Sequence, residues 1–525
     1  MRKIQKTQLM ELLHTLCKAC GELESVPAGQ DYVNLCADIQ DFVSGIFDFL
    51  QNAENKNTKT ADLLASFYEK LFFVSQEPKK AGALTDLAKE LAGCAEKELK
   101  ADRIEAAFFC YKASMSDSLE SIYLAAKADP HCDAYFIPIP YFDRNQDGSL
   151  GKIHYEAEGF YPEQYELTDW RSYKTEERRP DVVFIMNPYD GCNLVTTVHP
   201  DYYAGKLKDC TPLLVYVPYI VHSEVISPQM AATPGVLFSH RTIVQSEHIR
   251  NQYIDSICRY FPDTVRADWE KRIVALGSPK TDRVLSAKKE NFPVLDQWKG
   301  LLAGAEGKRI ILYNLSLETA LAYSQGENRG AYLKKLQSVL QFFRERKEIL
   351  LWWRPHPLLA ETFLRLDKTI FEEYQRLVKE YQAAGYGIFD ETPDMDRAIA
   401  FSDACYGDES SLNLLMQFSG KPVLVQNMRN AGCEPKRSGS REHALQSMKD
   451  FAEQDHYNSY ILYEVMNPAA GGFSLADFLD HLDVVEGFKE KQSGKYKARY
   501  TNADGSAGQK IYDYVRKLSQ EDLNG

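Results

Sequence analysis

The chain has 525 residues, enough for three or more domains that each bury a core of their own. Apolar residues make up 44% and charged residues 26%, which is ordinary for a globular protein and excludes a largely disordered chain. Acidic residues outnumber basic ones by 75 to 62, and the resulting net charge of −13 argues against nucleic acid as a partner.

The first hundred residues have the spacing of helices. Apolar side chains recur three and four positions apart, as at Leu9, Leu12, Leu13 and Leu16. A polar stretch at Glu77–Lys80 precedes a further predicted helix over 84–99. We therefore expect an N-terminal helical domain over residues 1–100.

From Ile104 onward, short apolar runs alternate with helical segments, which is typical of parallel βαβ units. The pattern predicts an α/β fold with two doubly wound, Rossmann-like domains over residues 101–300 and 301–430, which meet near 285–308. The strands expected in the first are 106–111, 134–139, 182–186, 213–217 and 242–244. Those expected in the second are 310–313, 349–353, 387–389, 404–406 and 422–425, with helices over 332–346 and 362–384 between them.

The remaining segment, residues 431–525, is less regular. A turn at Asn502–Gly505 precedes a predicted helix over 507–518. We expect a C-terminal helical tail that packs on the two halves. Because open α/β sheets bind ligands beyond the carboxyl ends of their strands, chemistry is sought in the loops that follow them.

One such loop is Trp352-Trp353-Arg354-Pro355-His356-Pro357, where an apolar strand ends in an Arg and a His between prolines. Proline fixes its own φ and restricts the residue before it, so both side chains are held stiffly. The Arg fork suits phosphate, and the His adds a hydrogen-bond donor or an acid/base group. A capped turn without a ligand is the alternative.

A second loop follows the strand at 404–406 and reads Gly407-Asp408-Glu409-Ser410-Ser411 before a helix. Ser410, Ser411 and the amide groups of the helix start could hold a phosphate, although serines also cap helices without a ligand. We expect Asp408 and Glu409 to cap the turn or to contact ribose and glycerol hydroxyl groups.

These two loops, together with Gly277-Ser278-Pro279-Lys280-Thr281-Asp282, resemble the CDP-glycerol glycerophosphotransferase family of teichoic acid enzymes. That family carries G-x-P-R-x-D, R-x-H-P and D-x-S-S segments in this order, and the resemblance spans about residues 104–425. It implies a GT-B fold and transfer of glycerol phosphate from CDP-glycerol, or another CDP-alcohol, to a hydroxyl acceptor such as a lipid-linked glycan. Because such a transfer needs mainly positioning and electrostatics, we expect no cofactor and no obligatory metal.

Matched by motif, the resemblance makes Arg354, His356, Ser410 and Ser411 pyrophosphate-binding positions. Asp408 matches the family Asp. Gly277, Ser278, Pro279, Lys280 and Asp282 join the substrate-binding candidates, with Lys280 in place of the family Arg. His356 is also a catalytic candidate.

Besides Lys280, the chain departs from the family pattern in two further places. The family's W-H-G-T-P segment, whose His is taken as the base, is replaced by Val217-Pro218-Tyr219-Ile220-Val221-His222, so His222 is the catalytic candidate and His240 its competitor. The family's P-T-x-R segment is replaced by Asn314-Leu315-Ser316. Tyr219 and Asn314 complete the substrate-binding candidates.

Two other functions stay open: a sugar-nucleotide glycosyltransferase, and a non-catalytic member that keeps the nucleotide cleft. The chain lacks a long apolar run and a secretion signal, so we expect a cytoplasmic protein. Arg2, Lys3 and Lys6 leave peripheral contact with the inner face of the membrane as an alternative to a plain solvated helix face.

Overall fold

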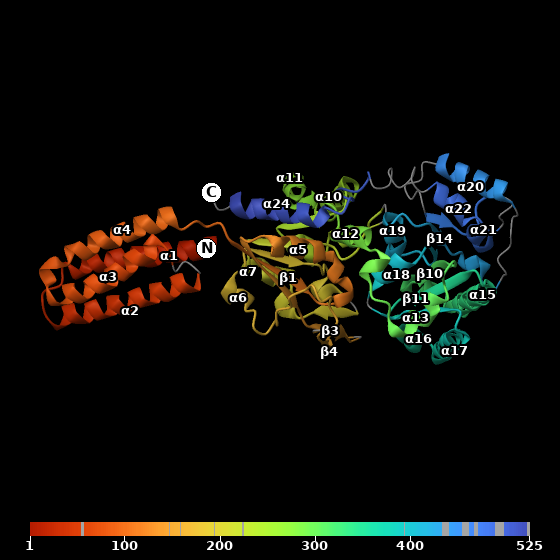
Figure 1. Ribbon diagram of the computed structural model, residues 1–525, viewed down its shortest axis with the longest axis horizontal. Coiled ribbons are helices and arrows are strands. Elements are labelled where there is room, and N and C mark those ends of the chain that lie inside the picture. The colour runs from red at the N-terminus through yellow and green to blue at the C-terminus, as the bar shows by residue number, and fades with distance from the viewer. Residues whose placement is uncertain are drawn as a thin grey trace.

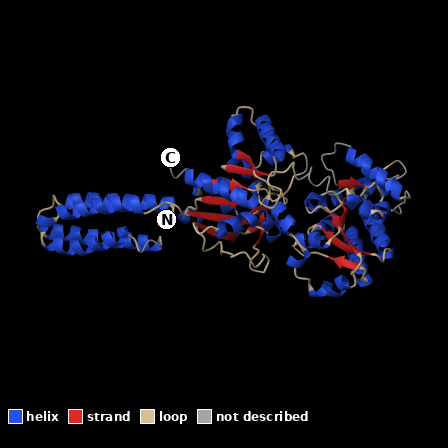
Figure 2. Ribbon diagram, turned by 45° about the horizontal axis from the view of Figure 1, so that its top comes forward, coloured by secondary structure: helices blue, strands red, loops and turns tan. Residues whose placement is uncertain are grey.

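A computed structural model describes residues 1–525 except 54–56, 146, 158, 194, 223–224, 393, 433–439, 454–460, 467–470, 489–497 and 522–525. Three parts follow one another along the long axis (Figure 1): a helical bundle and two α/β halves. In Figure 2 each half shows its strands as a separate sheet with helices around it. Among the described residues, no helix is long and apolar enough to cross a bilayer.

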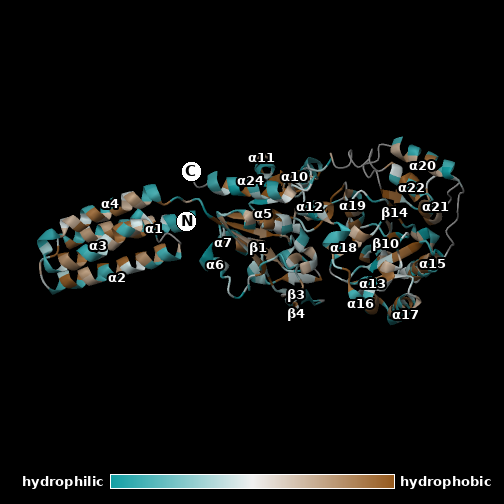
Figure 3. Cartoon of the chain, in the orientation of Figure 1, coloured by the Kyte–Doolittle hydropathy of each residue, from teal (hydrophilic) through white to brown (hydrophobic). Residues whose placement is uncertain are grey.

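The N-terminal part consists of four antiparallel helices that extend away from the halves: α1 (Lys3–Leu23), α2 (Gln30–Asn52), α3 (Lys59–Gln76) and α4 (Gly82–Glu98). Each buries one stripe of apolar residues, such as Leu9, Leu13, Leu16, Cys20 and Leu23 of α1. Figure 3 shows hydrophobic and hydrophilic stretches alternating along these helices. The three-and-four spacing of the sequence therefore corresponds to the bundle core.

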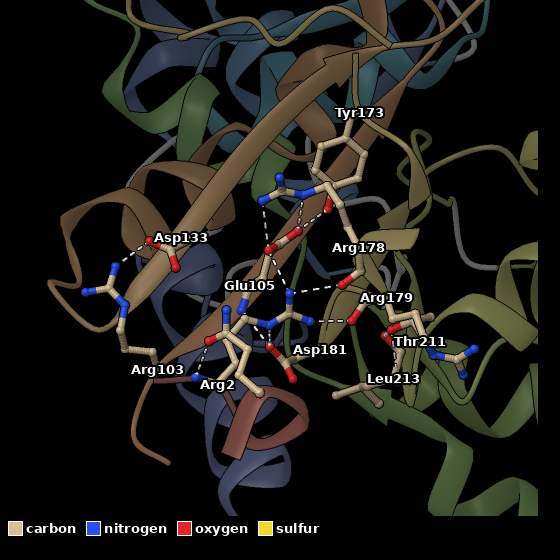
Figure 4. A network of polar contacts seen from close by, with 11 residues as sticks. Arg2, Arg103, Glu105, Asp133, Tyr173, Arg178, Arg179, Asp181, Thr211 and Leu213 are labelled. Carbon is tan, nitrogen blue, oxygen red and sulfur yellow. Dashed lines mark hydrogen bonds and ion pairs between the residues drawn. The ribbon is translucent and has the colours of Figure 1, made fainter. Parts of the chain in front are cut away.

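A buried network joins this bundle to the first sheet (Figure 4). Arg2, the residue before α1, donates to Glu105 of β1 and to Asp181, both over 2.8 Å. Glu105 also accepts hydrogen bonds from Tyr173 over 2.7 Å and from Arg178. Arg2 is only 6% exposed. Arg2 is therefore unavailable for the alternative of membrane contact, because its charge is already satisfied inside the protein.

The first half contains a parallel sheet in the order β2-β1-β5-β7-β8-β9. Its strands are β1 (Ile104–Cys110), β2 (Cys132–Pro138), β5 (Val182–Ile185), β7 (Leu213–Tyr216), β8 (Arg241–Val244) and β9 (Ile273–Ala275). A small antiparallel sheet, β4-β3-β6, is formed by β3 (Tyr141–Arg144), β4 (Leu150–His154) and β6 (Thr196–Val198). The helices are α5 (Glu120–Ala128), α6 (Thr175–Arg178), α7 (Ala204–Cys210), α8 (Pro228–Ala231), α9 (Pro234–Phe238), α10 (Glu247–Tyr260), α11 (Arg266–Arg272) and α12 (Pro279–Ser286).

The second half contains a parallel sheet in the order β12-β11-β10-β13-β14-β15. Its strands are β10 (Arg309–Leu315), β11 (Ile349–Pro355), β12 (Gly387–Phe389), β13 (Ala404–Gly407), β14 (Val423–Val425) and β15 (Ile461–Tyr463). Its helices are α13 (Asp296–Ala303), α14 (Leu317–Ala322), α15 (Ala331–Glu345), α16 (Leu359–Leu366), α17 (Lys368–Ala384), α18 (Met395–Phe401), α19 (Ser411–Phe418), α20 (Arg441–Glu453), α21 (Leu475–Asp480) and α22 (Leu482–Gly487). The strand order reverses between β10 and β13, the place at which doubly wound sheets bind ligands.

The predicted fold class is confirmed: two parallel six-stranded sheets with helices follow an N-terminal helical region. Three details differ from the sequence pattern. The helix expected over 362–384 is two helices, because Asp367 caps the start of α17 with its side chain. Strands β9 and β15 were not predicted, because three residues are too few to show the alternation of a strand. The last helix, α24 (Ala507–Glu521), packs on α5 and α12 of the first half.

Candidate functional site

The carboxyl ends of β10 and β13 are joined by short contacts. The side-chain amide of Asn314 donates to Ser410 Oγ over 2.9 Å, and the backbone of Asp408 donates to the Asn314 carbonyl oxygen over 2.9 Å. Gly407 has a φ of 150°, and a Cβ there would collide with the Asn314 carbonyl group. Gly407 therefore allows the two strand ends to approach each other at the switch point.

Asp408 is buried within this junction. Its carboxylate accepts hydrogen bonds from the Ser316 backbone over 2.7 Å, from the Tyr332 hydroxyl over 2.6 Å and from Gln426. Burial raises its pKa above the ordinary value for Asp. The hydrogen bonds of the Asp408 carboxylate therefore go largely to the loops that follow β10 and β14.

The two serines after Asp408 open α19. Ser410 stands at the N-cap, where its hydroxyl lies 3.0 Å from Asn413 Oδ1, and Ser411 is exposed. Glu409 is exposed too and accepts a hydrogen bond from the Tyr463 hydroxyl over 3.1 Å. No side-chain hydrogen bond caps α19, and the Asn413 backbone N–H donates to the Ser410 carbonyl oxygen over 3.1 Å.

Arg354 ends β11 and points toward the neighbouring strand end. Its guanidinium donates to Asp390 Oδ2 over 2.8 Å and to the Thr392 carbonyl oxygen over 2.7 Å. Asp390 is fully buried and also accepts from the Trp352 indole over 2.9 Å. The Arg354 side chain is therefore fixed by the loop after β12.

His356 follows in the same turn. Its backbone donates to the Leu315 carbonyl oxygen over 3.0 Å, and its Nδ1 accepts from the Leu358 backbone over 3.1 Å. Burial, together with the charges of Lys112 and Arg354, lowers the pKa of His356. This leaves a neutral imidazole at neutral pH whose Nε2 is the nitrogen without a backbone partner.

Lys112 is a residue of this region that the sequence analysis missed. It follows β1, and its ammonium group lies 5.0 Å from the ring centre of Tyr141 and 5.8 Å from that of Tyr111. Burial lowers its pKa. The charge of Lys112 is one of the causes that lower the pKa of His356. Lys112 is therefore a cation of the first half that lies toward the Arg-Pro-His turn of the second half. Its position directly after an apolar strand was the available sequence clue.

The two histidines proposed as bases are placed differently. His222 follows β7, is buried, and lies 2.8 Å through Nε2 from the Tyr253 hydroxyl; burial lowers its pKa to about 4. Its backbone is fixed by Gln245 on both sides. His240 precedes β8 and accepts from the Leu214 backbone through Nδ1 over 2.8 Å. His240 therefore lies at the amino end of the sheet, opposite to the cleft.

The segment from Gly277 to Asp282 holds the end of the chain. Gly277 has a φ of 97°, and a Cβ there would collide with the Thr501 carbonyl group. Asp282 accepts from the first amide groups of α24, at Ala507 over 3.1 Å and Gly508 over 2.7 Å. Ser278 and Pro279 begin α12, and Lys280 forms an ion pair with Asp117. Helix α12 also contacts α19, the helix that follows β13.

Tyr219 is half-buried after β7, and burial is the first cause of its raised pKa, followed by the charges of Tyr111 and Tyr189. It thus lies with the strand ends of the first half.

A cavity of about 860 Å³ lies between the halves, and none of its lining residues is among the site residues predicted from the sequence. Its walls come from the loop after β1, residues 160–164, the end of α12, the segment after α12 and the loop after β12. Arg283 crosses it, donating to Glu120 over 2.7 and 3.0 Å and to Asp396 of α18 over 3.0 Å. Burial and the charge of Asp117 raise the pKa of Asp396 to about 7.

No protein-family model matches the chain, and no curated protein matches it either. Among solved structures, the wall teichoic acid polymerase TagF is 14% identical, with 89% of this chain and 99% of that chain covered and a TM-score of 0.43. The MnaA–UDP structure from S. aureus is 10% identical, with 79% and 96% covered and a TM-score of 0.41. A UDP-N-acetylglucosamine 2-epimerase is 11% identical, with 80% and 97% covered and a TM-score of 0.41. These are likenesses of a GT-B-like fold between chains that share few residues.

Proposed function

We propose that this protein transfers glycerol phosphate, or a related phospho-alcohol, from a CDP-activated donor to an acceptor hydroxyl with release of CMP, in the synthesis of a teichoic acid-like polymer. The observation that carries the proposal is the meeting of three strand ends. The end of β10 contacts Ser410 through Asn314 and the His356 backbone through Leu315. The two phosphate-binding motifs of the family resemblance therefore flank one junction.

The site suits a pyrophosphate group. Arg354 supplies a guanidinium group and α19 supplies the amide groups of its first turn, and both favour a phosphate oxygen. Lys112 adds a cation from the opposite half. Such donors act most strongly where they are already fixed, as Arg354 is by Asp390.

In the proposed reaction, the acceptor oxygen forms a bond to the β-phosphorus of the donor. The bond from that phosphorus to the oxygen bridging to the α-phosphate breaks, and CMP leaves with the electron pair. The hydroxyl proton passes to His222, which is neutral at pH 7 because burial lowers its pKa to about 4. Phosphoryl transfer depends chiefly on positioning and electrostatics, which these residues can provide.

The test is to incubate the protein with CDP-glycerol, CDP-ribitol and a panel of UDP-sugars, and to measure free CMP, UMP and UDP together with the melting temperature. CDP-glycerol should be consumed and should raise the melting temperature, since it binds the native state. Ser410→Ala should weaken both effects. Ser419→Ala, at the other end of α19, is the matched control and should not. A response to UDP-sugars alone would replace the proposal with a glycosyltransferase.

A further inference from the structure

The cavity between the halves opens beside the proposed donor site. Thr392, which lines it, is the residue whose carbonyl group holds Arg354. On the opposite wall, Ala113 and Ser114 directly follow Lys112. At about 860 Å³, the cavity has the size of a site for a small organic molecule. A ligand in it would lie next to the turn that carries His356.

The walls of this cavity are acidic. Among the described residues that line it are five carboxylates, Asp117, Glu120, Glu163, Asp394 and Asp396, and two guanidinium groups, Arg283 and Arg397. Asp396, whose pKa burial raises to about 7, is only partly ionised at neutral pH. The other four carboxylates still outnumber the three cations when Lys280, which pairs with Asp117, is counted with Arg283 and Arg397. The positive charges are engaged as well, because Arg283 is held by Glu120 and Asp396.

Two features of the walls indicate a ligand rather than an ordinary gap. Asp396 is 5% exposed, yet its Oδ1 has no hydrogen-bond partner among the described residues, and the same is true of Asp117 Oδ1. Aromatic rings also contribute to the walls: Phe160 is 56% exposed, and Tyr161 and Phe292 are buried. Carboxylates and rings together can accept hydroxyl hydrogen bonds and cover the apolar face of a sugar.

We propose that this cavity binds the acceptor, and that the acceptor is an uncharged glycan or polyol rather than a polyanionic chain of glycerol phosphate units. The inference rests on the proposed function. A neutral hydroxyl compound can donate hydrogen bonds to these carboxylates. A phosphodiester chain would bring further negative charge among them, in a setting where partial burial limits screening by salt. The protein would then start a polymer on a glycan and not extend one.

Glu163 offers a direct test, because it is exposed on the cavity rim and makes no hydrogen bond or ion pair with a described residue. Glu163→Lys reverses one charge without disturbing the buried cluster. Glu177→Lys, on exposed α6 in the same half, makes the same charge change outside the cavity lining and is the matched control.

The experiment measures binding to each protein by calorimetry without a donor, using N,N′-diacetylchitobiose as the neutral probe and a trimer of glycerol phosphate as the anionic probe. The wild type should bind the neutral probe at least about tenfold more tightly. Glu163→Lys should reduce this preference severalfold, and Glu177→Lys should leave it unchanged. Equal or tighter binding of the anionic trimer, or no binding of the neutral probe, would overturn the inference.

Turnover separates this inference from the proposed function. If the neutral probe binds as expected but CDP-glycerol is not consumed in its presence, the proposed reaction fails and the preference of the cavity stands. If CDP-glycerol is consumed only with the anionic trimer, the reaction stands and the inference about the acceptor fails.

Discussion

The guanidinium of Arg354 lies 2.8 Å from the carboxylate of Asp390, and Asp390 has no exposed surface. The charge that we assign to donor binding is therefore one half of a buried ion pair between the ends of β11 and β12. Replacing Arg354 should therefore have two separable effects, one on donor affinity and one on the stability of the fold.

Arg354→Ala should lower both donor affinity and stability, because it leaves the buried Asp390 without its cation. Breaking a buried pair on one side costs about 3–5 kcal/mol. The double variant Arg354→Ala/Asp390→Asn removes the stranded charge, so urea denaturation should show part of the stability regained while donor binding stays weak. Equal stability of the single and double variants would contradict this account.

His356→Ala and His222→Ala should both reduce turnover, for different reasons. His356 stands in the turn beside Arg354, so its loss should weaken donor binding as well as turnover. His222 as the base acts only on the acceptor proton, so its loss should lower kcat by about 10²–10⁴-fold with little change in donor affinity. Wild-type kcat in His222→Ala would remove it as the base. His240, held at the amino end of the sheet, is no replacement.

The stability of the protein should depend on Asp396. Burial and the charge of Asp117 raise its pKa to about 7, against the opposing influence of Arg283 and Lys280 and with a further rise from Asp394. The native state thus keeps a proton that the unfolded chain releases near pH 4, so this contribution is complete below about pH 4 and is lost as pH rises through 7.

Asp396→Asn should therefore lose less stability than the wild type between pH 4 and 7, as measured by denaturation at several pH values. Burial also raises the pKa of Asp190 to about 7, and its contribution is present in both proteins. Parallel pH profiles for the two proteins would show that Asp396 is ionised throughout.

Arg2→Ala should destabilise the attachment of the helical bundle to the first sheet. Glu105 keeps its ion pair with Arg178, but Asp181 loses the one cation that pairs with it among the described residues (Figure 4). We expect a loss of up to about 3–5 kcal/mol in thermal or chemical unfolding. Lys3→Ala, one position along, is the control and should unfold like the wild type.

The sequence predicted those parts of the fold that depend on local pattern. The runs that became β1, β5, β7, β10 and β11 are continuous apolar segments, as strands buried on both faces require. β9 and β15 have three residues each, and their pairing is decided by neighbouring strands rather than by their own composition.

The candidate site also has parts that could be predicted from the sequence and parts that could not. Asn314 lies at the end of β10, and His356 and Ser410 follow β11 and β13; all three were identified by position, and the fold joins them at one edge. Lys112 and the acidic cavity were missed, because the cavity walls come from five separate segments that only the packing of the halves brings together. Lys280 and Asp282 carry a family motif, yet here they contact Asp117 and α24.

The attachment of α24 has a mechanical consequence. The chain passes from the first half to the second after α12, and it returns near Tyr500, whose ring lies 4.7 Å from that of Phe418, and Thr501, which donates to the Gln245 carbonyl group over 2.9 Å. The two halves are thus joined by two chain connections, which restrain their relative motion more than a single connection would. The halves can rotate about the line through both connections, whereas twisting about any other axis must stretch one of them. Opening and closing around a bound substrate should therefore follow a single swing.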